Sequence, residues 1–256
     1  MSEQTILLNK AEGIATIYLN RPEKKNAMTL EMWKQIPKIL AELENDKKVK
    51  SVIIRGVNRQ VFCAGADIEE FSIERVNASR SQYYDNQLTA AGDALENFPK
   101  PVIAMIEGPC IGGGSEIALA CDIRFSSESG IFGITPAKIG LIYGVPQTKR
   151  LIDAVGPSRA KDILFSGRFL DTAEAYQFGL IDHVYPTESI VEETYNYAKL
   201  LGIRSQSTIK AAKEISQAIL AGTVDNEFDH NAAYFSNDIH EGIKAFKEKR
   251  KPQFSE

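Results

Sequence analysis

Two glycine-containing turns hold the residues of this chain that are best suited to chemistry. They span residues 62–68 and 108–116, and each follows an apolar run typical of a strand. Turns of this kind placed side by side would point two backbone N–H groups at one spot. A converging N–H pair stabilises a carbonyl oxygen that becomes negative during reaction, which is among the largest single contributions to catalysis. The sequence therefore predicts an oxyanion site where the two turns meet.

The second turn is richer in glycine than a simple turn requires. Gly112, Gly113 and Gly114 are consecutive, so we expect something to approach this backbone closely. Nucleotide binding is disfavoured, because a P-loop needs Lys before its Ser/Thr, where this chain has Gly114 before Ser115, and the G-x-G-x-x-G pattern is absent. Glu116 opens the apolar helical stretch that follows. A carboxylate on a buried helix needs a partner or a task, whereas on the surface it would only cap the helix.

The elements that must position these turns alternate between strands and helices. Residues 5–19 predict two strands hinged at Glu12 and Gly13, and Thr29 is expected to cap a helix that Pro37 kinks. Residues 72–82 are expected to form a mobile loop before a second helix over 83–98. Further strands are predicted at 51–56, 102–107, 123–125 and 131–134, and further helices at 146–155, 158–165, 172–178 and throughout the region from 188, ending with 225–249.

The overall composition is that of an ordinary soluble globular protein, with 43% hydrophobic and 25% charged residues in 256. The formal net charge of −4 argues against a nucleic-acid partner. No long apolar run and no signal peptide are visible, so we expect no membrane association and a cytoplasmic location. Three cysteines without a C-x-x-C spacing and three histidines without ligand spacing predict neither disulfides nor a metal site, and a reactive thiol is disfavoured.

Four segments of the chain resemble the crotonase superfamily, also called the enoyl-CoA hydratase/isomerase family. They are residues 20–28, 62–68, 108–116 and 241–252, and they occur in the same order and spacing over essentially the whole chain. The resemblance implies an α/β fold of the ClpP/crotonase type. In it, residues 1–190 would form a spiral of ββα units with the CoA site, and residues 191–256 a helical trimerisation region packed with it as one unit. It further implies homotrimers or dimers of trimers that bind acyl-CoA.

The same resemblance assigns site residues. It places the oxyanion hole on the backbone N–H groups of Ala66 and Gly113, and it makes Glu116 a catalytic residue. No cofactor is implied beyond the coenzyme A of the substrate thioester. The residues expected to contact that CoA, the last two often in a neighbouring subunit, are Arg21, Lys24, Ala64, Asp67, Ile68, Phe246 and Lys249.

One departure from the hydratase pattern bears on the reaction. Enoyl-CoA hydratases resemble one another in using two glutamates, and Pro136 occupies the place of the second. Proline cannot move a proton. The segment 135–143 instead resembles the methylmalonyl-CoA decarboxylase branch, which carries a catalytic tyrosine where this chain has Tyr143. Ala66, in contrast, is the residue that hydratases have.

Three functions therefore remain open. The sequence favours an acyl-CoA lyase that acts through an oxyanion-stabilised thioester enolate and decarboxylates a small 2-carboxyacyl-CoA. The alternatives are an enoyl-CoA hydratase or isomerase that uses a single glutamate, and a non-catalytic acyl-CoA binder or scaffold.

Overall fold

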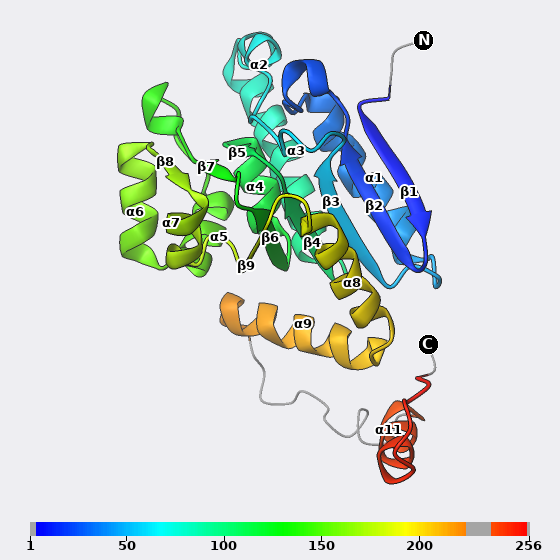
Figure 1. Cartoon of the computed structure of the whole chain (residues 1–256). Helices are drawn as coiled ribbons and strands as arrows, with labels where there is room; N and C mark the ends of the chain where they lie inside the picture. Colours follow the sequence, from blue (N-terminus) through cyan, green and yellow to red (C-terminus); the bar gives the residue numbers. More distant parts are fainter. Residues whose placement is uncertain (1–3, 224–236, 255–256) are drawn as a thin grey trace.

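The central element of the fold is a six-stranded sheet with strand order β1-β2-β3-β4-β6-β9 (Figure 1). The computed structural model describes residues 4–223 and 237–254. β1 and β2 pair antiparallel and the other neighbours pair parallel. The strands are β1 (Ile6–Ala11), β2 (Ile14–Leu19), β3 (Ser51–Gly56), β4 (Val102–Ile106), β6 (Ile123–Ser127) and β9 (His183–Tyr185).

The first two strands form the hairpin expected from the sequence. Glu12 and Gly13 turn the chain with φ of 52° and 78°. Such left-handed conformations suit glycine and reverse the chain within two residues. Ala11 then lies opposite Ile14 in the antiparallel register.

A smaller sheet of order β5-β7-β8 carries the second glycine turn. The isolated bridge between Cys63 and Cys110 joins β5 to the first glycine turn, so the two turns are neighbours in space. The sequence did not predict β5, β8 or β9, each only three residues long. The three strands of this sheet are β5 (Pro109–Ile111), β7 (Ile131–Gly133) and β8 (Phe169–Asp171).

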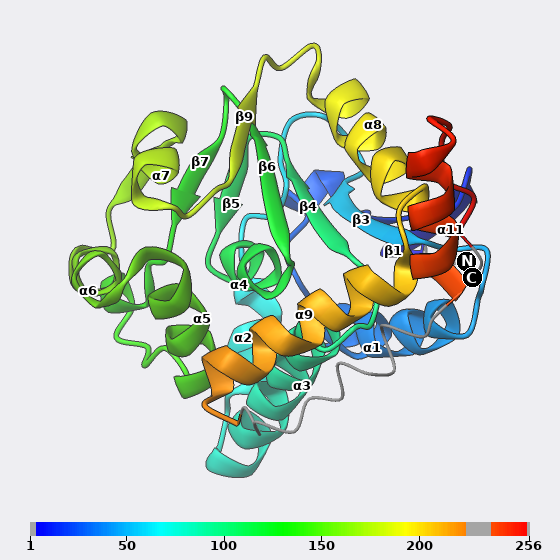
Figure 2. The same cartoon turned by 90° about the horizontal axis from the view of Figure 1, so that it is seen from below.

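Both faces of the central strands β3 and β4 are buried, which explains their continuous apolar sequences. Val52 and Ile54 of β3 join the main core with α1 (Leu30–Glu44), α3 (Ala78–Glu96) and α4 (Gly113–Ala120). Ile53, between them, faces the other way and packs with Ile190 and Ala198 of α8 (Ile190–Gly202). Figure 2 shows α8 beside the strands and α9 (Gln206–Ala221) crossing below them.

The expected N-cap and apolar stripe of α1 are confirmed. The Thr29 side chain accepts a hydrogen bond from the Met32 N–H at 3.2 Å. Pro37 lies inside the helix, which continues to Glu44. The predicted core positions Trp33, Ile36, Leu40 and Leu43 are all buried.

The prediction of a mobile loop at residues 72–82 is wrong. Residues 68–74 form α2 (Ile68–Glu74) and α3 already begins at Ala78. Asp67 caps α2 by accepting from the Glu69 and Glu70 N–H groups, and Asn77 caps α3 by accepting from the Arg80 N–H. The helices form despite a polar sequence because capping satisfies their first N–H groups and their exposed faces need no apolar residues.

The region between the small sheet and the C-terminal helices follows the expected order. Two single 3₁₀ turns, η1 (Pro22–Lys24) and η2 (Pro136–Lys138), lie in the segments that flank the site. The helices predicted at 146–155, 158–165 and 172–178 are confirmed as α5 (Val145–Val155), α6 (Pro157–Ser166) and α7 (Thr172–Phe178).

Beyond residue 188 the regular structure of the described residues is helical, whereas residues 251–254 have no regular structure. The last helix, α11 (Asn237–Lys247), covers part of the helix predicted over 225–249, whose first residues lie outside the described ranges. In Figure 1, α11 lies beyond α9, at the end of the molecule opposite α2. The division into 1–190 and 191–256 stays a prediction.

Candidate active site

The first glycine turn is held by backbone pairing on both sides. Phe62 and Cys63 donate N–H groups to the Pro109 carbonyl, each at 3.1 Å. Further along, Met28 donates to the Gly65 carbonyl at 2.8 Å and accepts from the Asp67 N–H at 2.9 Å. Alternate residues of an extended segment point their N–H groups to opposite sides. The Ala66 N–H, between these two bonds, therefore points away from Met28.

The second turn delivers its N–H through a helix start. Gly112 has φ of 52° and ψ of −109°, and α4 begins at Gly113. The first N–H groups of a helix have no acceptor within the helix, and the helix dipole makes this end positive. Neither the Gly113 N–H nor the Ala66 N–H is hydrogen-bonded to another residue in the described part of the chain.

The two turns approach each other as closely as glycine permits. A Cβ atom on Gly113 would lie 3.5 Å from the Ala66 nitrogen. A Cβ on Gly112 would lie 3.7 Å from the Gly65 Cα, and one on Gly114 only 2.6 Å from the Cys63 carbonyl oxygen. The close approach expected at the three glycines is thus made by the first turn itself. Ala66 and Gly113 therefore lie next to each other, and the binding of an oxyanion by their amides stays a prediction.

Glu116 lies one helical turn beyond Gly113 and is only 1% exposed. Its Oε1 accepts from Arg150 Nη1 at 2.7 Å, and its Oε2 accepts from the Tyr143 hydroxyl at 3.4 Å. Burial raises the pKa of Glu116 to about 7, and the Arg150 charge and hydrogen bond oppose that rise. Glu116 is therefore not a surface cap, and near neutral pH it can both accept and donate a proton.

Tyr143 lies in the segment between η2 and α5 and is half-buried. Burial and the neighbouring Glu116 carboxylate raise the pKa of Tyr143 well above its usual value. The phenol therefore stays protonated and acts as a hydrogen-bond donor. Tyr143 and Glu116, which are distant in sequence, are brought together by α4 and α5.

A cavity of about 430 Å³ joins these groups. Its volume lies in the range usual for small-molecule sites. The amide-bearing residues Ala66 and Gly113 line it together with Glu116, Tyr143 and Pro136. Pro136, which the sequence resemblance places where hydratases have a second glutamate, is buried in the cavity wall. The polar residues that line the cavity also include Arg75, Gln82, Asp85, Asn86, Thr89, Thr135 and Gln147.

The residues expected at the pantetheine end of CoA divide into two kinds. Ala64 and Ile68 line the cavity mouth, where Ile68 is 64% exposed. Asp67 does not line the cavity, because it caps α2 and forms an ion pair with Arg21 at 2.8 Å. Arg21 also donates to the Ala27 carbonyl at 2.7 Å, so its guanidinium fastens the segment around η1.

The remaining expected CoA contacts lie on the surface. Lys24 pairs with Glu69 at 3.0 Å and keeps an exposed side chain. Phe246 is 86% exposed and Lys249 is exposed. Both belong to the α11 region, on the opposite side of the chain from the cavity (Figure 1). Their contact with CoA stays a prediction.

Other chemistry finds little support in the described residues. Cys63, Cys110 and Cys121 are free and buried, and burial raises the pKa of Cys63 and of Cys121 to about 12. No cluster of three or more His, Cys, Asp or Glu side chains suited to a metal occurs within residues 4–223 and 237–254. Over the same residues, none of the helices has the length and apolarity needed to cross a bilayer.

Sequence reasoning missed Arg150 and Gly92. Arg150 is buried on the inner face of α5, together with Gln147 and Leu151. Polar residues at helical spacing on an otherwise apolar stripe were the available signal. Gly92 lies inside α3, and its lack of a side chain leaves room for the Arg150–Glu116 pair.

Comparison with known proteins agrees with this architecture. The family model described as enoyl-CoA hydratase/isomerase matches residues 9–256. Human mitochondrial methylglutaconyl-CoA hydratase is 36% identical over 253 residues, which cover 94% of this chain and 74% of that protein. Two solved structures of this family confirm the expected crotonase-type α/β fold.

An enoyl-CoA hydratase/carnitine racemase from Magnetospirillum magneticum has a TM-score of 0.94 at 35% identity and covers 99% of this chain and 96% of its own. An enoyl-CoA hydratase from Bacillus anthracis has a TM-score of 0.91 at 31% identity and covers 98% and 99%. With a family match over nearly its whole length and relatives above 30% identity, this chain belongs to the enoyl-CoA hydratase/isomerase family of the crotonase superfamily.

Proposed function

We propose that this chain is an acyl-CoA lyase that forms a thioester enolate by decarboxylating a small 2-carboxyacyl-CoA. The observation that carries the proposal is the pair of unbonded amides, Ala66 and Gly113, that border one cavity with Glu116 and Tyr143. A thioester oxygen bound by both amides would be stabilised as it becomes negative.

Decarboxylation needs no base, which fits a site in which, among the described residues, Glu116 is the one carboxylate beside the two amides. The bond between the α-carbon and the carboxylate carbon breaks, and CO₂ leaves. The electron pair of that bond delocalises onto the thioester oxygen held by Ala66 and Gly113. The α-carbon of the enolate then takes a proton from Glu116, and solvent reprotonates Glu116. The pKa of about 7 gives Glu116 a protonated fraction at neutral pH, and a substrate carboxylate nearby would increase that fraction.

In this proposal Tyr143 orients the substrate carboxylate. Its phenol is a donor and lies within 3.4 Å of Glu116 Oε2, so it is close to the acid that must reach the α-carbon. A donated hydrogen bond would hold the substrate carboxylate out of the plane of the thioester, where the breaking bond overlaps the carbonyl π system. Pro136 occupies the position expected for a second catalytic glutamate, and a proline cannot activate water there.

The test is turnover with two substrates. We expect CO₂ release from methylmalonyl-CoA and little hydration of crotonyl-CoA. Hydration of crotonyl-CoA at ordinary enzymatic rates, without CO₂ release from methylmalonyl-CoA, would refute the decarboxylase proposal.

A single-glutamate hydratase or isomerase is the second candidate. It is supported by the position of Glu116 beside the two amides and by the hydratase names of relatives 31% and 36% identical. In that case Glu116 would work as a base, and enoyl-CoA substrates would be turned over. A non-catalytic acyl-CoA binder is the third candidate. Calorimetric binding of CoA thioesters without product from enoyl-, 2-carboxy- and β-hydroxyacyl-CoAs would favour it.

The assembly is also a proposal. We propose homotrimers or dimers of trimers, in the cytoplasm, with no cofactor apart from the CoA of the substrate. The support is the position of α11: Phe246 is 86% exposed and remote from the cavity of its own chain, so it would reach a CoA only in a neighbouring subunit. Light scattering of the purified protein tests the trimer, and a monomer at micromolar concentration would contradict it.

A further inference from the structure

Glu116 forms a buried ion pair with Arg150, a residue that the sequence analysis did not assign to the site. Arg150 of α5 donates from Nη1 to Glu116 Oε1 at 2.7 Å, and the two side chains are only 5% and 2% exposed. Arg150 does not line the cavity that holds the Ala66 and Gly113 amides, whereas Glu116 does. Among the residues that line that cavity, Glu116 is the one with which Arg150 forms an ion pair.

The guanidinium is itself fixed by α3. Its Nε donates to Glu96 Oε2 at 2.9 Å and its Nη2 to Asp93 Oδ1 at 2.6 Å. Three carboxylates on different sides of a planar group leave it little freedom to turn. Arg150 thus presents Nη1 to Glu116 in one direction.

Gly92 has no side chain and so leaves room for the Arg150–Glu116 ion pair. A Cβ atom at this position would lie 2.6 Å from Arg150 Nη1 and 2.8 Å from Glu116 Oε1. Glycine in a helix interior is unfavourable relative to alanine, so its presence in α3 is accounted for by this approach. The contact between α3, α4 and α5 is shaped around the ion pair.

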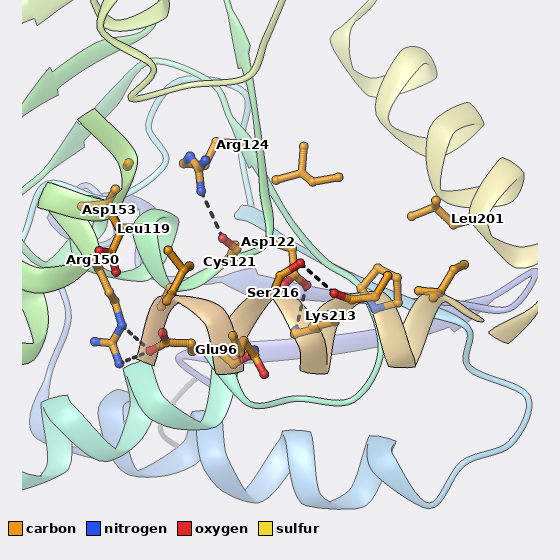
Figure 3. Close-up of a pocket in the computed structure, with 18 residues that line it drawn as sticks. Glu96, Leu119, Cys121, Asp122, Arg124, Arg150, Asp153, Leu201, Lys213 and Ser216 are labelled. Atoms are coloured by element: carbon orange, nitrogen blue, oxygen red, sulfur yellow. Dashed lines mark hydrogen bonds and ion pairs between the residues drawn. The ribbon is translucent and has the colours of Figure 1, made fainter. Parts of the chain in front are cut away.

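The outer side of Arg150 faces a second cavity, of about 450 Å³, between the core and α9. Figure 3 shows Arg150 and Glu96 at one end of it, with the Asp122–Lys213 ion pair further along. Arg150 therefore lies between the two cavities. Glu96 on α3, which binds the guanidinium, lines the second cavity, whereas Glu116 lines the first.

We propose that Arg150 is the positioning residue of the active site: it fixes the direction of the Glu116 carboxylate and keeps a positive charge beside it. The inference rests on the proposed role of Glu116 in proton transfer. Glu116 receives two donors, Arg150 on Oε1 and Tyr143 on Oε2, and the carboxylate plane is set by both. Replacement of Arg150 would free the Oε1 side.

The charged groups around Glu116 determine the sign of the expected titration. Arg150 on α5 lowers the pKa of Glu116, Tyr143 lowers it by hydrogen bonding, and Glu96 on α3 raises it. Asp93 on α3 faces Arg150. Removal of the Arg150 charge therefore moves the Glu116 pKa upward, and an opposite charge at this range is worth about 1–3 units.

The experiment compares Arg150→Met, Arg150→Lys and Gly92→Ala with Lys149→Met as the matched control. Lys149 is the neighbouring cation on α5; its side chain is 48% exposed and pairs with Asp153. The Glu116 pKa is read by carbon-13 NMR of labelled glutamate in the full-length protein, with Glu116→Gln to assign the signal. The pH profile of kcat is recorded on the same proteins.

We expect Arg150→Met to raise the Glu116 pKa by about 1–3 units and to shift the pH at which kcat changes upward by the same amount. Lys149→Met should change neither value. Arg150→Lys and Gly92→Ala keep a positive charge but lose the geometry, so kcat should fall at least about tenfold with KM little changed. The inference is overturned if Glu116 titrates in folded Arg150→Met as in the wild type. Should Arg150→Met not fold, wild-type kcat in both Arg150→Lys and Gly92→Ala overturns it.

The two proposals fail in different ways. If no CoA thioester is turned over, the proposed function fails, but the NMR titration still reports whether Arg150 controls Glu116. If turnover is found and the titration is unmoved, the function stands and the role of Arg150 falls.

Discussion

Replacement of Gly114 by alanine tests the convergence of the two glycine turns without removing either amide. The added Cβ would lie 2.6 Å from the Cys63 carbonyl oxygen and 2.8 Å from the Cys63 Cβ. The turns must separate by about 0.8 Å to restore ordinary contact at 3.4 Å. Gly113 precedes the new side chain directly, so its N–H moves away from Ala66.

The expected loss follows from that displacement. A misplacement near 1 Å in a catalytic site costs on the order of 10²-fold, and loss of one oxyanion donor costs about 10²–10³-fold in kcat. We therefore expect kcat to fall about 10²-fold, which is about 2.7 kcal/mol of barrier. Overpacking should also lower the free energy of unfolding by about 1–3 kcal/mol.

Two assays report on this variant. The first is kcat on the CoA thioester that the wild type turns over. The second is the infrared stretching frequency of a bound thioester carbonyl, which hydrogen bonds from the two amides lower. Gly202→Ala is the matched control, because its Cβ would lie at an ordinary 3.8 Å from the Lys50 Cβ. A folded Gly114→Ala protein with kcat within about threefold of wild type and an unchanged carbonyl frequency would refute the paired-amide site.

Four further predictions concern the acid, the phenol, the pH dependence and the thiols. Glu116→Gln should lower turnover at least about tenfold, about 1.4 kcal/mol, and an unchanged rate would remove Glu116 from the chemistry. Tyr143→Phe should lower kcat by at least about as much and raise the pKa of Glu116, because Oε2 loses its donor. Burial raises the pKa of Glu116 to about 7, so an acid role predicts that kcat is full below that pH and declines as pH rises through it. A limb that rises with pH would instead assign Glu116 as a base and favour the hydratase or isomerase. The cysteines should react with a disulfide reagent at pH 8 only after denaturation, since burial raises the pKa of all three thiols; rapid reaction of the native protein would contradict their burial.

Local patterns were sufficient for most of the fold. The alternation of strand, turn and helix around residues 51–68 and 102–120 predicted the sheet and both glycine turns, because a buried parallel strand is a continuous apolar run. The helix of residues 30–44 was predicted from its cap and stripe, which are properties of neighbouring residues.

The failure at residues 72–82 has a physical cause. These residues are polar and lack an apolar stripe, which is typical of a loop. Two carboxamide or carboxylate caps, Asp67 and Asn77, instead begin helices whose outer faces remain in solvent. The short strands β5, β8 and β9 failed for a related reason, since three residues carry too little periodicity and their pairing depends on partners distant in sequence.

The sequence by itself determined the class of the fold, the two glycine turns and the absence of a second acid at Pro136. It also marked Glu116 as a buried carboxylate that required a partner. These are properties of residue type and local order, which survive in the unfolded chain as patterns.

Only the tertiary structure decided which groups meet. It brought the Ala66 and Gly113 amides to one space, and it placed Tyr143 and Arg150 on the two oxygens of Glu116. Folding changed the acidity of Glu116, because a pKa depends on burial and on neighbouring charges that the linear order does not contain. Contacts between elements far apart in the chain are set by packing, and here the space beside Gly92 allows Arg150 and Glu116 to pair.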